Sequence, residues 1–136
     1  QSLTSEQVLK TLLTFPRARL VQTYACTEAA SSLTFDVLNG VTKESRERSG
    51  NRVGASPPHI EIAIFSQGDN TRLGFDKVGI IATRGRHVMN GYWKRGTKQR
   101  NEYQNNEWLF TNDLGYLDSN QRLYFCGRVT DVIRTG

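Results

Sequence analysis

Four side chains in three short segments of this 136-residue chain could together hold a nucleotide. Tyr24 and Glu28 share the first segment, Asp113 lies in the second, and Arg128 lies in the third. A tyrosine ring can stack on a planar heterocycle for about 1–3 kcal/mol, and a glutamate is an oxygen ligand suited to Mg²⁺. An aspartate and an arginine can grip vicinal hydroxyls. Their combination predicts a nucleotide site.

Each of the four residues also has a purely structural interpretation. Tyr24 could form the edge of a core, and Glu28 could be a first-turn carboxylate that the helix dipole favours. Asp113 could be a turn former and Arg128 half of a surface ion pair. Taken singly, none of them indicates function, so the hypothesis depends on their combination.

The elements that would position these residues begin with a short amphipathic helix over 5–14. Its apolar residues recur at helical spacing behind a cap at Thr4 or Ser5, and Pro16 ends the pattern. Residues 18–24 predict a buried strand that leads into a turn, an arrangement typical of alternating strands and helices.

The rest of the chain predicts strands after a long polar loop. The polar and basic segment 36–58 is expected at the surface. Five apolar runs predict strands: 60–65, 78–83, 108–110, 114–117 and 122–125. The expected fold class is α/β plus antiparallel β, with the end of an α/β subdomain over 1–50 and a small sheet or β-barrel-like subdomain over 51–130.

The balance of charge favours an anionic partner. The chain has 18 basic and 13 acidic residues, for a formal net charge of +5. The basic residues gather over 43–52 and 84–100, but no helix-turn-helix, zinc-finger or RNA-platform motif accompanies them. A nucleotide or the phosphates of coenzyme A would suit the second cluster as well as nucleic acid would. A nucleic-acid binder, supported by charge alone, is the weakest alternative.

The cysteines and the apolar stretches exclude several other classes. Cys26 and Cys126 have no partner at ligand spacing, so we expect two reduced, packed thiols and neither a zinc site nor a disulfide framework. No stretch approaches the roughly 20 apolar residues of a membrane span, and residues 1–4 lack a signal-peptide pattern.

Five motifs occur in a recognisable order: Tyr24–Glu28, Gly79–Gly85, Gly91–Trp93, Trp108–Asp113 and Gly127–Gly136. Over essentially the whole chain they resemble the adenylate-forming acyl-CoA synthetase superfamily. The resemblance implies an intracellular ATP-dependent acid:CoA ligase that uses ATP, Mg²⁺ and coenzyme A. A small carboxylic acid would attack the α-phosphate of ATP, and the acyl group of the resulting adenylate would pass to the thiol of coenzyme A.

The resemblance also implies a role for each motif residue. Tyr24 would stack on adenine. Thr27 would hydrogen-bond the α-phosphate and Glu28 would hold Mg²⁺, so both would take part in catalysis. Asp113 and Arg128 would bind the ribose hydroxyls. The aromatic residues of 91–93 and Trp108 are expected to pack in the core.

Three further expectations concern the substrate and the hinge. Ser31 and Ser32 would face the acyl pocket, or alternatively would only cap the following turn. Asp131 would be the hinge to a carboxy-terminal domain, so 131–136 is the expected hinge segment. Residues 27–35 and 83–89 look most like the plant 2-succinylbenzoate:CoA ligases of phylloquinone synthesis, which implies a chloroplast or a peroxisome. A 4-coumarate or fatty acyl-CoA ligase is the alternative.

Three positions depart from the superfamily pattern. Ala25, beside the nucleotide, and Asn112 each replace a usual glycine, and Ile80 replaces a usual glutamate. Ala25 would be costly if its backbone needed positive φ, whereas Asn112 tolerates left-handed geometry. These departures support a second alternative, a degenerate nucleotide-binding module without catalysis. The family's phosphate loop and catalytic lysine find no match here, so we expect the chain alone to have no ligase turnover.

Overall fold

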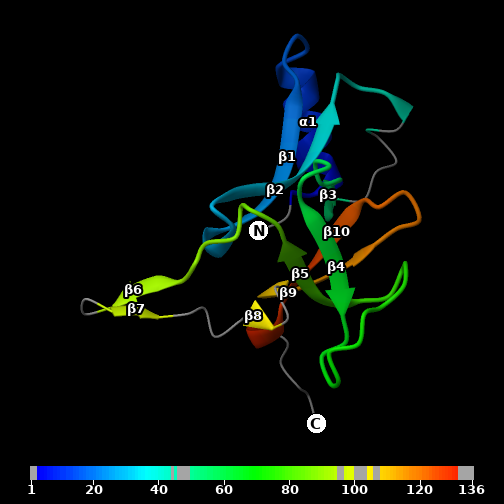
Figure 1. Cartoon of the computed structure of the whole chain (residues 1–136). Helices are drawn as coiled ribbons and strands as arrows, with labels where there is room; N and C mark the ends of the chain where they lie inside the picture. Colours follow the sequence, from blue (N-terminus) through cyan, green and yellow to red (C-terminus); the bar gives the residue numbers. More distant parts are fainter. Residues whose placement is uncertain are drawn as a thin grey trace.

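Two lobes make up the computed structural model of the chain (Figure 1). The structure describes residues 3–43, 45, 50–94, 97–99, 104–105 and 108–131. The upper lobe consists of a helix beside a β-hairpin, and the lower lobe is built on an antiparallel sheet.

The helix α1 spans Ser5–Thr14, as predicted. Thr4 caps it, because the Thr4 hydroxyl accepts a hydrogen bond from the Gln7 backbone N at 3.2 Å while the Gln7 side chain accepts one from the Thr4 backbone N at 2.8 Å. This reciprocal pair satisfies two of the amide groups left open at a helix start. Val8 and Leu12 are buried against Leu38 of the hairpin and fix the helix to it.

The hairpin consists of β1 (Leu20–Cys26) and β2 (Ser31–Leu38), which pair antiparallel. The short 3-10 helix η1 (Thr27–Ala29) joins them, and Ala30 closes the turn with a φ of 59°. The strand expected over 18–24 is therefore confirmed with a small shift. A second strand follows it, so the expected alternation of strand and helix is wrong at this point.

The long surface loop expected over 36–58 is also wrong. It overlaps β2 and contains β3 (Arg52–Gly54), and two of its charged residues, Asp36 and Arg52, are only 8% and 5% exposed. Their side chains form an ion pair, with Arg52 Nε 3.1 Å from Asp36 Oδ2. Opposite charges that neutralise each other can be buried together, which a polar composition does not reveal.

The lower sheet has the strand order β3-β10-β9-β5-β4, with β8 paired to β9. Its other members are β4 (Glu61–Phe65), β5 (Gly79–Arg84), β8 (Gln104–Asn105), β9 (Trp108–Leu117) and β10 (Leu123–Arg128). All described pairings are antiparallel, which confirms the predicted class, but the described sheet stays open and is not a closed barrel.

The edge of the sheet at β3 connects to the upper lobe. Phe35 and Ala55 exchange backbone hydrogen bonds of 3.0 and 3.2 Å, so β2 is hydrogen-bonded to the residue that follows β3. The hydrophobic core spans the junction, because Leu33 of the hairpin clusters with Ile81, Leu109 and Leu123 of the sheet. The hairpin turn is thereby held against the strands that carry the other candidate site residues.

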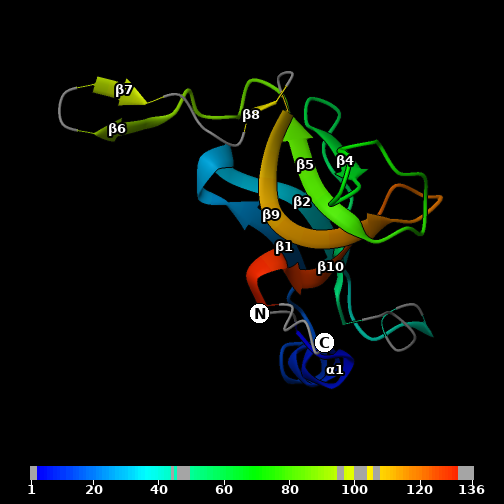
Figure 2. The same cartoon turned by 90° about the horizontal axis from the view of Figure 1, so that it is seen from below.

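A separate hairpin of β6 (Tyr92–Lys94) and β7 (Thr97–Gln99) projects away from both lobes in two views (Figures 1 and 2). At the other end of the chain, the 3-10 helix η2 (Val129–Asp131) follows β10. Among the described residues, no helix is long and apolar enough to cross a membrane.

Both cysteines are free thiols, as predicted. Cys26 is half-buried and packs against the core, whereas Cys126 is exposed, so the expectation that both are packed is wrong for Cys126.

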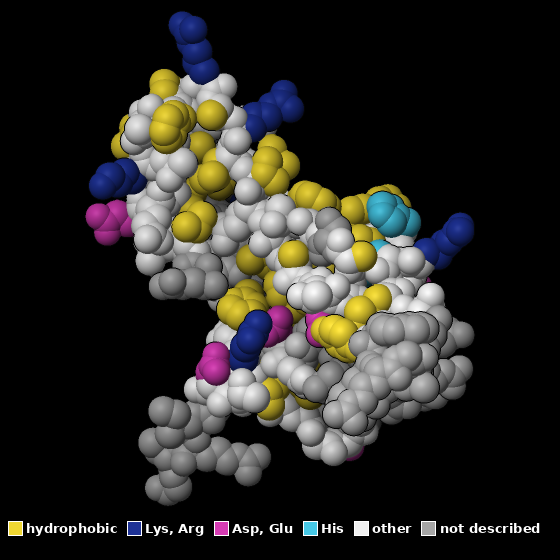
Figure 3. All heavy atoms as spheres, turned by 90° about the vertical axis from the view of Figure 1, so that its left-hand side faces the viewer, with side chains coloured by type: hydrophobic (Ala, Val, Ile, Leu, Met, Phe, Trp, Pro, Cys, Tyr) yellow, Lys and Arg dark blue, Asp and Glu magenta, His cyan; other side chains and the backbone are white. Residues whose placement is uncertain are grey.

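Hydrophobic side chains also lie on the surface of the upper lobe (Figure 3), where Val21 and Val37 are 45% and 49% exposed.

Candidate functional site

A cleft at the junction of the lobes gathers most of the predicted site residues. It consists of two adjoining hollows of about 760 and 520 Å³ that share Ala25, Asp113 and Arg128. Tyr24 and Asp131 line the larger hollow. Figure 3 shows basic and acidic side chains at the waist between the lobes.

The smaller hollow contains the turn of the hairpin. Thr27 and Glu28 line it together with the three shared residues. The fold thus brings together residues from β1, η1, β9 and β10 that are separated by up to about 100 positions in the sequence. Seven of the nine predicted site residues line one hollow or both.

Tyr24 and Asp113 form the buried wall of the cleft. The Tyr24 hydroxyl donates to Asp113 Oδ2 at 2.7 Å, and both residues are 6% exposed. The Tyr24 ring also lies 6.1 Å from the ring of Phe125, centroid to centroid. Burial raises the pKa of the Tyr24 hydroxyl well above its ordinary value, and the hydrogen bond to Asp113 adds to that effect. Tyr24 is therefore a neutral donor that fixes the carboxylate.

Arg128 pairs with the other oxygen of the same carboxylate. Its Nε lies 3.3 Å from Asp113 Oδ1, and the two residues are directly paired across β9 and β10. The Arg128 side chain is 68% exposed, whereas that of Asp113 is 9% exposed. One oxygen of Asp113 is therefore held by a buried donor and the other by a solvated cation. A ligand hydroxyl could share or replace only the second contact.

The bend that presents Asp113 occurs at Asn112, which has a φ of 60°. Thr111 stabilises this bend, since its hydroxyl donates to the Ile81 carbonyl at 2.9 Å and accepts from the Asp113 backbone N at 3.3 Å. Asn112 thus adopts the left-handed geometry that an asparagine tolerates. The bend lies within β9, so residues 108–117 form one bent strand and not the two strands that the sequence predicted.

The other two departures, Ala25 and Ile80, lie in different surroundings. Ala25 is not among the residues with positive φ and lies where the β1–β2 register shifts, so its methyl group meets no backbone strain of that kind. Ile80 is half-buried on β5, pairs with Phe65 and Leu114, and lines neither hollow.

Glu28 has a partner that the sequence did not predict. The Tyr92 hydroxyl donates to Glu28 Oε1 at 2.6 Å, and the Met89 backbone N donates to the Glu28 carbonyl at 2.8 Å. Tyr92 is 47% exposed, so the expectation that it packs in the core is wrong. No spacing rule connects residues 28 and 92, so no local pattern in the sequence indicates this contact.

Trp108 packs against other side chains but is half-buried and lies outside the core clusters, so the expectation that it packs in the core is met only in part. It makes an edge contact with Phe65, with ring centroids 5.5 Å apart, and Arg84 lies over its ring at 4.8 Å. The side chain of Trp93 lies outside the part of the chain that the structure describes. Cys26 lines the smaller hollow, where burial raises the pKa of its thiol to about 11 and keeps it protonated near neutral pH.

The predicted substrate and hinge residues are placed less fully. Ser32 is half-buried on β2, pairs with Ala25 and lines neither hollow, while the side chain of Ser31 is outside the described part. Asp131 closes η2 at the mouth of the larger hollow. The remainder of the predicted hinge, 132–136, lies outside the described residues.

The donor set suits a cation that is shared with phosphate. Within the described residues, no three His, Cys, Asp or Glu side chains gather to hold a metal alone. Mg²⁺ in proteins is commonly bound by one or two carboxylates together with substrate phosphates and water. Glu28, which is half-buried and lines the smaller hollow, fits that pattern as a single protein ligand.

The comparison with protein families decides the relationship. The model of the AMP-binding enzyme family matches residues 2–93. The chain belongs to this AMP-binding enzyme family. The match includes β1, η1 and Tyr92, and therefore both Tyr24 and Glu28.

Relatives in this family include plant acid:CoA ligases. A 2-succinylbenzoate–CoA ligase of Arabidopsis thaliana, named as chloroplastic/peroxisomal, is 38% identical over 99% of this chain and 26% of its own length. A 4-coumarate–CoA ligase of Glycine max is 29% identical over 88% of this chain and 40% of its own length. The chain thus spans less than half the length of either relative.

A solved structure supports the fold. The O-succinylbenzoate coenzyme A synthetase of Bacillus subtilis, in complex with ATP and magnesium ion, matches with a TM-score of 0.73 and 29% identity. The match covers 94% of this chain and 26% of that protein. The two-lobed arrangement is therefore that of a segment of an adenylate-forming enzyme.

Proposed function

We propose that this chain supplies the nucleotide cleft of an ATP-dependent acid:CoA ligase. The observation that carries the proposal is that Tyr24, Asp113 and Arg128 line the larger hollow together, while Glu28 lines the adjoining smaller hollow. An aromatic ring, a fixed carboxylate and a solvent-exposed guanidinium suit a nucleoside, and a single half-buried carboxylate suits its phosphates with Mg²⁺.

In this proposal the nucleoside occupies the larger hollow. Adenine lies against Tyr24 and Ala25, and the ribose hydroxyls bond to Asp113. Arg128 is exposed enough to turn from Asp113 to the same ribose. Because Tyr24 already holds Asp113 Oδ2, the carboxylate is oriented before the ligand arrives, and less ordering is needed on binding.

The phosphates occupy the smaller hollow. Thr27 is exposed there and bonds to the α-phosphate, while Glu28 holds Mg²⁺, which supplies charge neutralisation when bound. A substrate carboxylate oxygen bonds to the α-phosphorus as the bond to pyrophosphate breaks. The thiol of coenzyme A then displaces AMP from the acyl carbon and loses its proton to solvent or a base.

The proposed acid is 2-succinylbenzoate. Support comes from the 38% identity to the Arabidopsis ligase that is named for this acid, against 29% for the 4-coumarate ligase. Ser31 and Ser32 remain the proposed acyl-pocket residues, 131–136 the proposed hinge, and 1–50 and 51–130 the proposed subdomains. We propose a chloroplast or a peroxisome as the compartment, as in the name of that relative.

The test is acid-dependent AMP release by the full-length protein with ATP, Mg²⁺ and coenzyme A. The acids are 2-succinylbenzoate, 4-coumarate and a medium-chain fatty acid, and Asp113→Asn is the control variant. Preference for 2-succinylbenzoate supports the proposal. Preference for another acid removes the substrate assignment alone, and no AMP release with any acid, despite measurable ATP binding, favours the degenerate nucleotide-binding module.

A further inference from the structure

The contact between Tyr92 and Glu28 has no role in the function proposed so far. At 2.6 Å it has the length of a hydrogen bond between a hydroxyl and an ionised carboxylate, which is among the stronger kinds in proteins. Tyr92 is 47% exposed, so burial does not fix its ring. The hydrogen bond is a contact through which the hydroxyl and the carboxylate orient each other.

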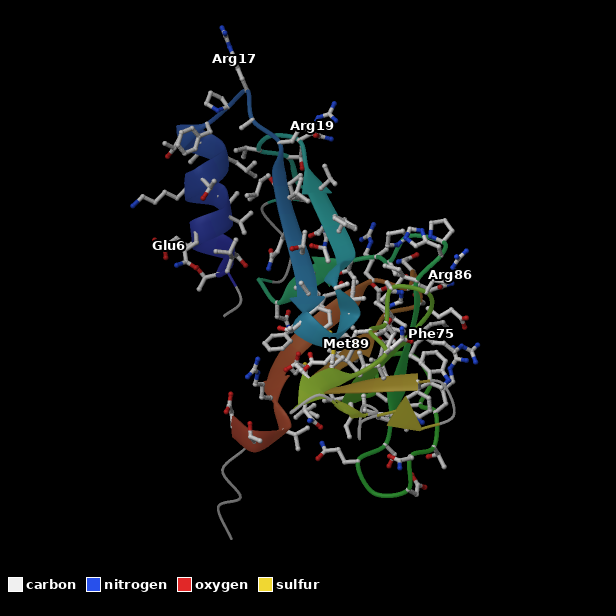
Figure 4. All side chains as sticks on the ribbon, turned by 60° about the vertical axis from the view of Figure 1, so that its left-hand side comes forward. Glu6, Arg17, Arg19, Phe75, Arg86 and Met89 are labelled. Carbon is white, nitrogen blue, oxygen red and sulfur yellow. The ribbon has the colours of Figure 1, made fainter. Side chains whose placement is uncertain are left out.

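The backbone before Tyr92 is fastened to the same turn. Met89 donates its backbone N–H to the Glu28 carbonyl at 2.8 Å, and Val88 packs against the core. Met89 lies where the hairpin turn meets the lower lobe (Figure 4). Gly91, with a φ of 131°, then turns the chain so that the next side chain reaches back to Glu28. The segment thus holds Glu28 at both its carbonyl and its carboxylate.

The two oxygens of Glu28 differ as a result. Oε1 accepts the Tyr92 hydroxyl, while Oε2 accepts no hydrogen bond from the residues that the structure describes. Glu28 lines the smaller hollow from a helix of only three residues. Its own backbone therefore does little to fix the orientation of the carboxylate. A donor on one oxygen fixes the direction in which the other is presented.

We propose that Tyr92 is a positioning residue that holds Glu28 Oε1 and so presents Oε2 to the Mg²⁺ that accompanies ATP. The inference rests on the proposed function, because it assumes that Glu28 is the metal ligand. Partners of this kind typically change metal affinity by about 10- to 100-fold when they are removed. Tyr92 itself lines neither of the two hollows.

The test measures metal binding directly in the full-length protein. Free Mn²⁺ is followed by electron paramagnetic resonance during titration in the presence of a non-hydrolysable ATP analogue. Tyr92→Phe should weaken Mn²⁺ binding by about tenfold. Binding of the analogue without metal should not change, and excess Mg²⁺ should restore AMP formation. Tyr116→Phe, at a half-buried tyrosine that lines neither hollow, is the matched control and should behave as the wild type.

A double-variant cycle separates this inference from the proposed function. If Glu28→Gln weakens Mn²⁺ binding and Tyr92→Phe adds nothing to that variant, the two residues act through one contact, as proposed. If Glu28→Gln weakens binding while Tyr92→Phe alone binds like the wild type, the positioning role is refuted and the metal role of Glu28 stands. If Glu28→Gln binds Mn²⁺ like the wild type, the metal assignment is wrong and the positioning role falls with it.

Discussion

The two sides of the cleft are held in opposite ways. On the buried wall, Tyr24 and Asp113 are 6% exposed and hydrogen-bonded to each other. On the exposed rim, Thr27 is exposed, Glu28 is half-buried, and Tyr92, which is 47% exposed, reaches Glu28 from a neighbouring segment. The wall is part of the hydrophobic core, whereas the rim is attached to it.

This difference suits the two ends of a nucleotide. A nucleoside keeps its shape through the proposed reaction, so a rigid, preorganised wall lowers the ordering cost of binding. The phosphates change their charge and geometry in the proposed reaction, so they suit a rim whose groups are held by hydrogen bonds near the surface and not by core packing. Substitutions on the wall should therefore reduce stability and nucleotide binding together, and substitutions on the rim should affect metal binding and turnover with little change in stability.

The largest expected effect is that of Glu28→Gln on the rim. We expect AMP formation to fall by about 100-fold or more, because a carboxylate that holds Mg²⁺ contributes several kcal/mol of charge stabilisation. The free energy of unfolding should change by less than about 0.5 kcal/mol, since the side chain is not part of the core. Rate assays and urea denaturation on the same samples measure both. A loss of stability equal to the loss of activity would break the distinction between wall and rim.

Asp113→Ala on the wall should show the opposite combination. Loss of the carboxylate leaves the Tyr24 hydroxyl buried without its acceptor, which should cost about 1–3 kcal/mol of stability. Nucleotide affinity should also fall by about 10- to 100-fold, the equivalent of one charged hydrogen bond. Titration with a fluorescent ATP analogue and urea denaturation are the measurements. Asp69→Ala, at an exposed loop carboxylate that lines neither hollow, is the control and should leave nucleotide affinity unchanged.

Tyr24→Phe removes only the hydroxyl from the wall. It should destabilise the protein by about 1–2 kcal/mol, because Asp113 Oδ2 loses its buried donor. Affinity for the nucleotide should fall less than in Asp113→Ala, since the ring and the carboxylate remain. Circular dichroism during urea denaturation at pH 7 gives the first value, and Tyr116→Phe provides a half-buried comparison.

The buried Tyr24 hydroxyl also predicts that the free energy of unfolding depends on pH. Burial raises the pKa of the Tyr24 hydroxyl in the folded state, whereas in the unfolded chain it ionises near its ordinary value of about 10. The contribution of the neutral hydroxyl is therefore complete below about pH 10 and is lost as the pH rises toward the folded pKa. Between pH 10 and 11, the wild type should lose more unfolding free energy than Tyr24→Phe. Equal slopes would contradict a buried, neutral hydroxyl.

Local patterns predicted much of the fold. The helix at 5–14 and the strands near 20–26, 61–65 and 79–84 follow from apolar periodicity and from turn residues, which are properties of neighbours in the sequence. The segment 36–58 could not be predicted in the same way. Its charged residues Asp36 and Arg52 are buried because they form an ion pair from different strands, although their charges by themselves indicate exposure.

The candidate site shows the same difference between local patterns and contacts of distant residues. Tyr24, Glu28 and Asp113 were identified because each lies in a short motif whose residue types imply a ligand. The hydrogen bond that fixes Tyr24 joins residues 89 positions apart, and the one that fixes Glu28 joins residues 64 positions apart. The sequence could therefore indicate which groups meet a nucleotide but not which groups hold them, and Tyr92 was missed for that reason.

The smallest expected effect is that of Arg128→Ala, which lies between wall and rim. An ion pair whose cation is 68% exposed contributes little to stability, about 0–1 kcal/mol, because solvent screens it. Nucleotide affinity should fall by only about two- to fivefold. The difference should shrink further at 0.5 M salt, where charges at the surface are screened over a few ångströms. Arg86→Ala, at an exposed arginine that lines neither hollow, should leave affinity unchanged at either salt concentration. If Arg128→Ala instead weakened binding as much as Asp113→Ala and did so at both salt concentrations, Arg128 would belong to the preorganised wall, and its contact with Asp113 would be a fixed part of the site and not one that a ribose hydroxyl can replace.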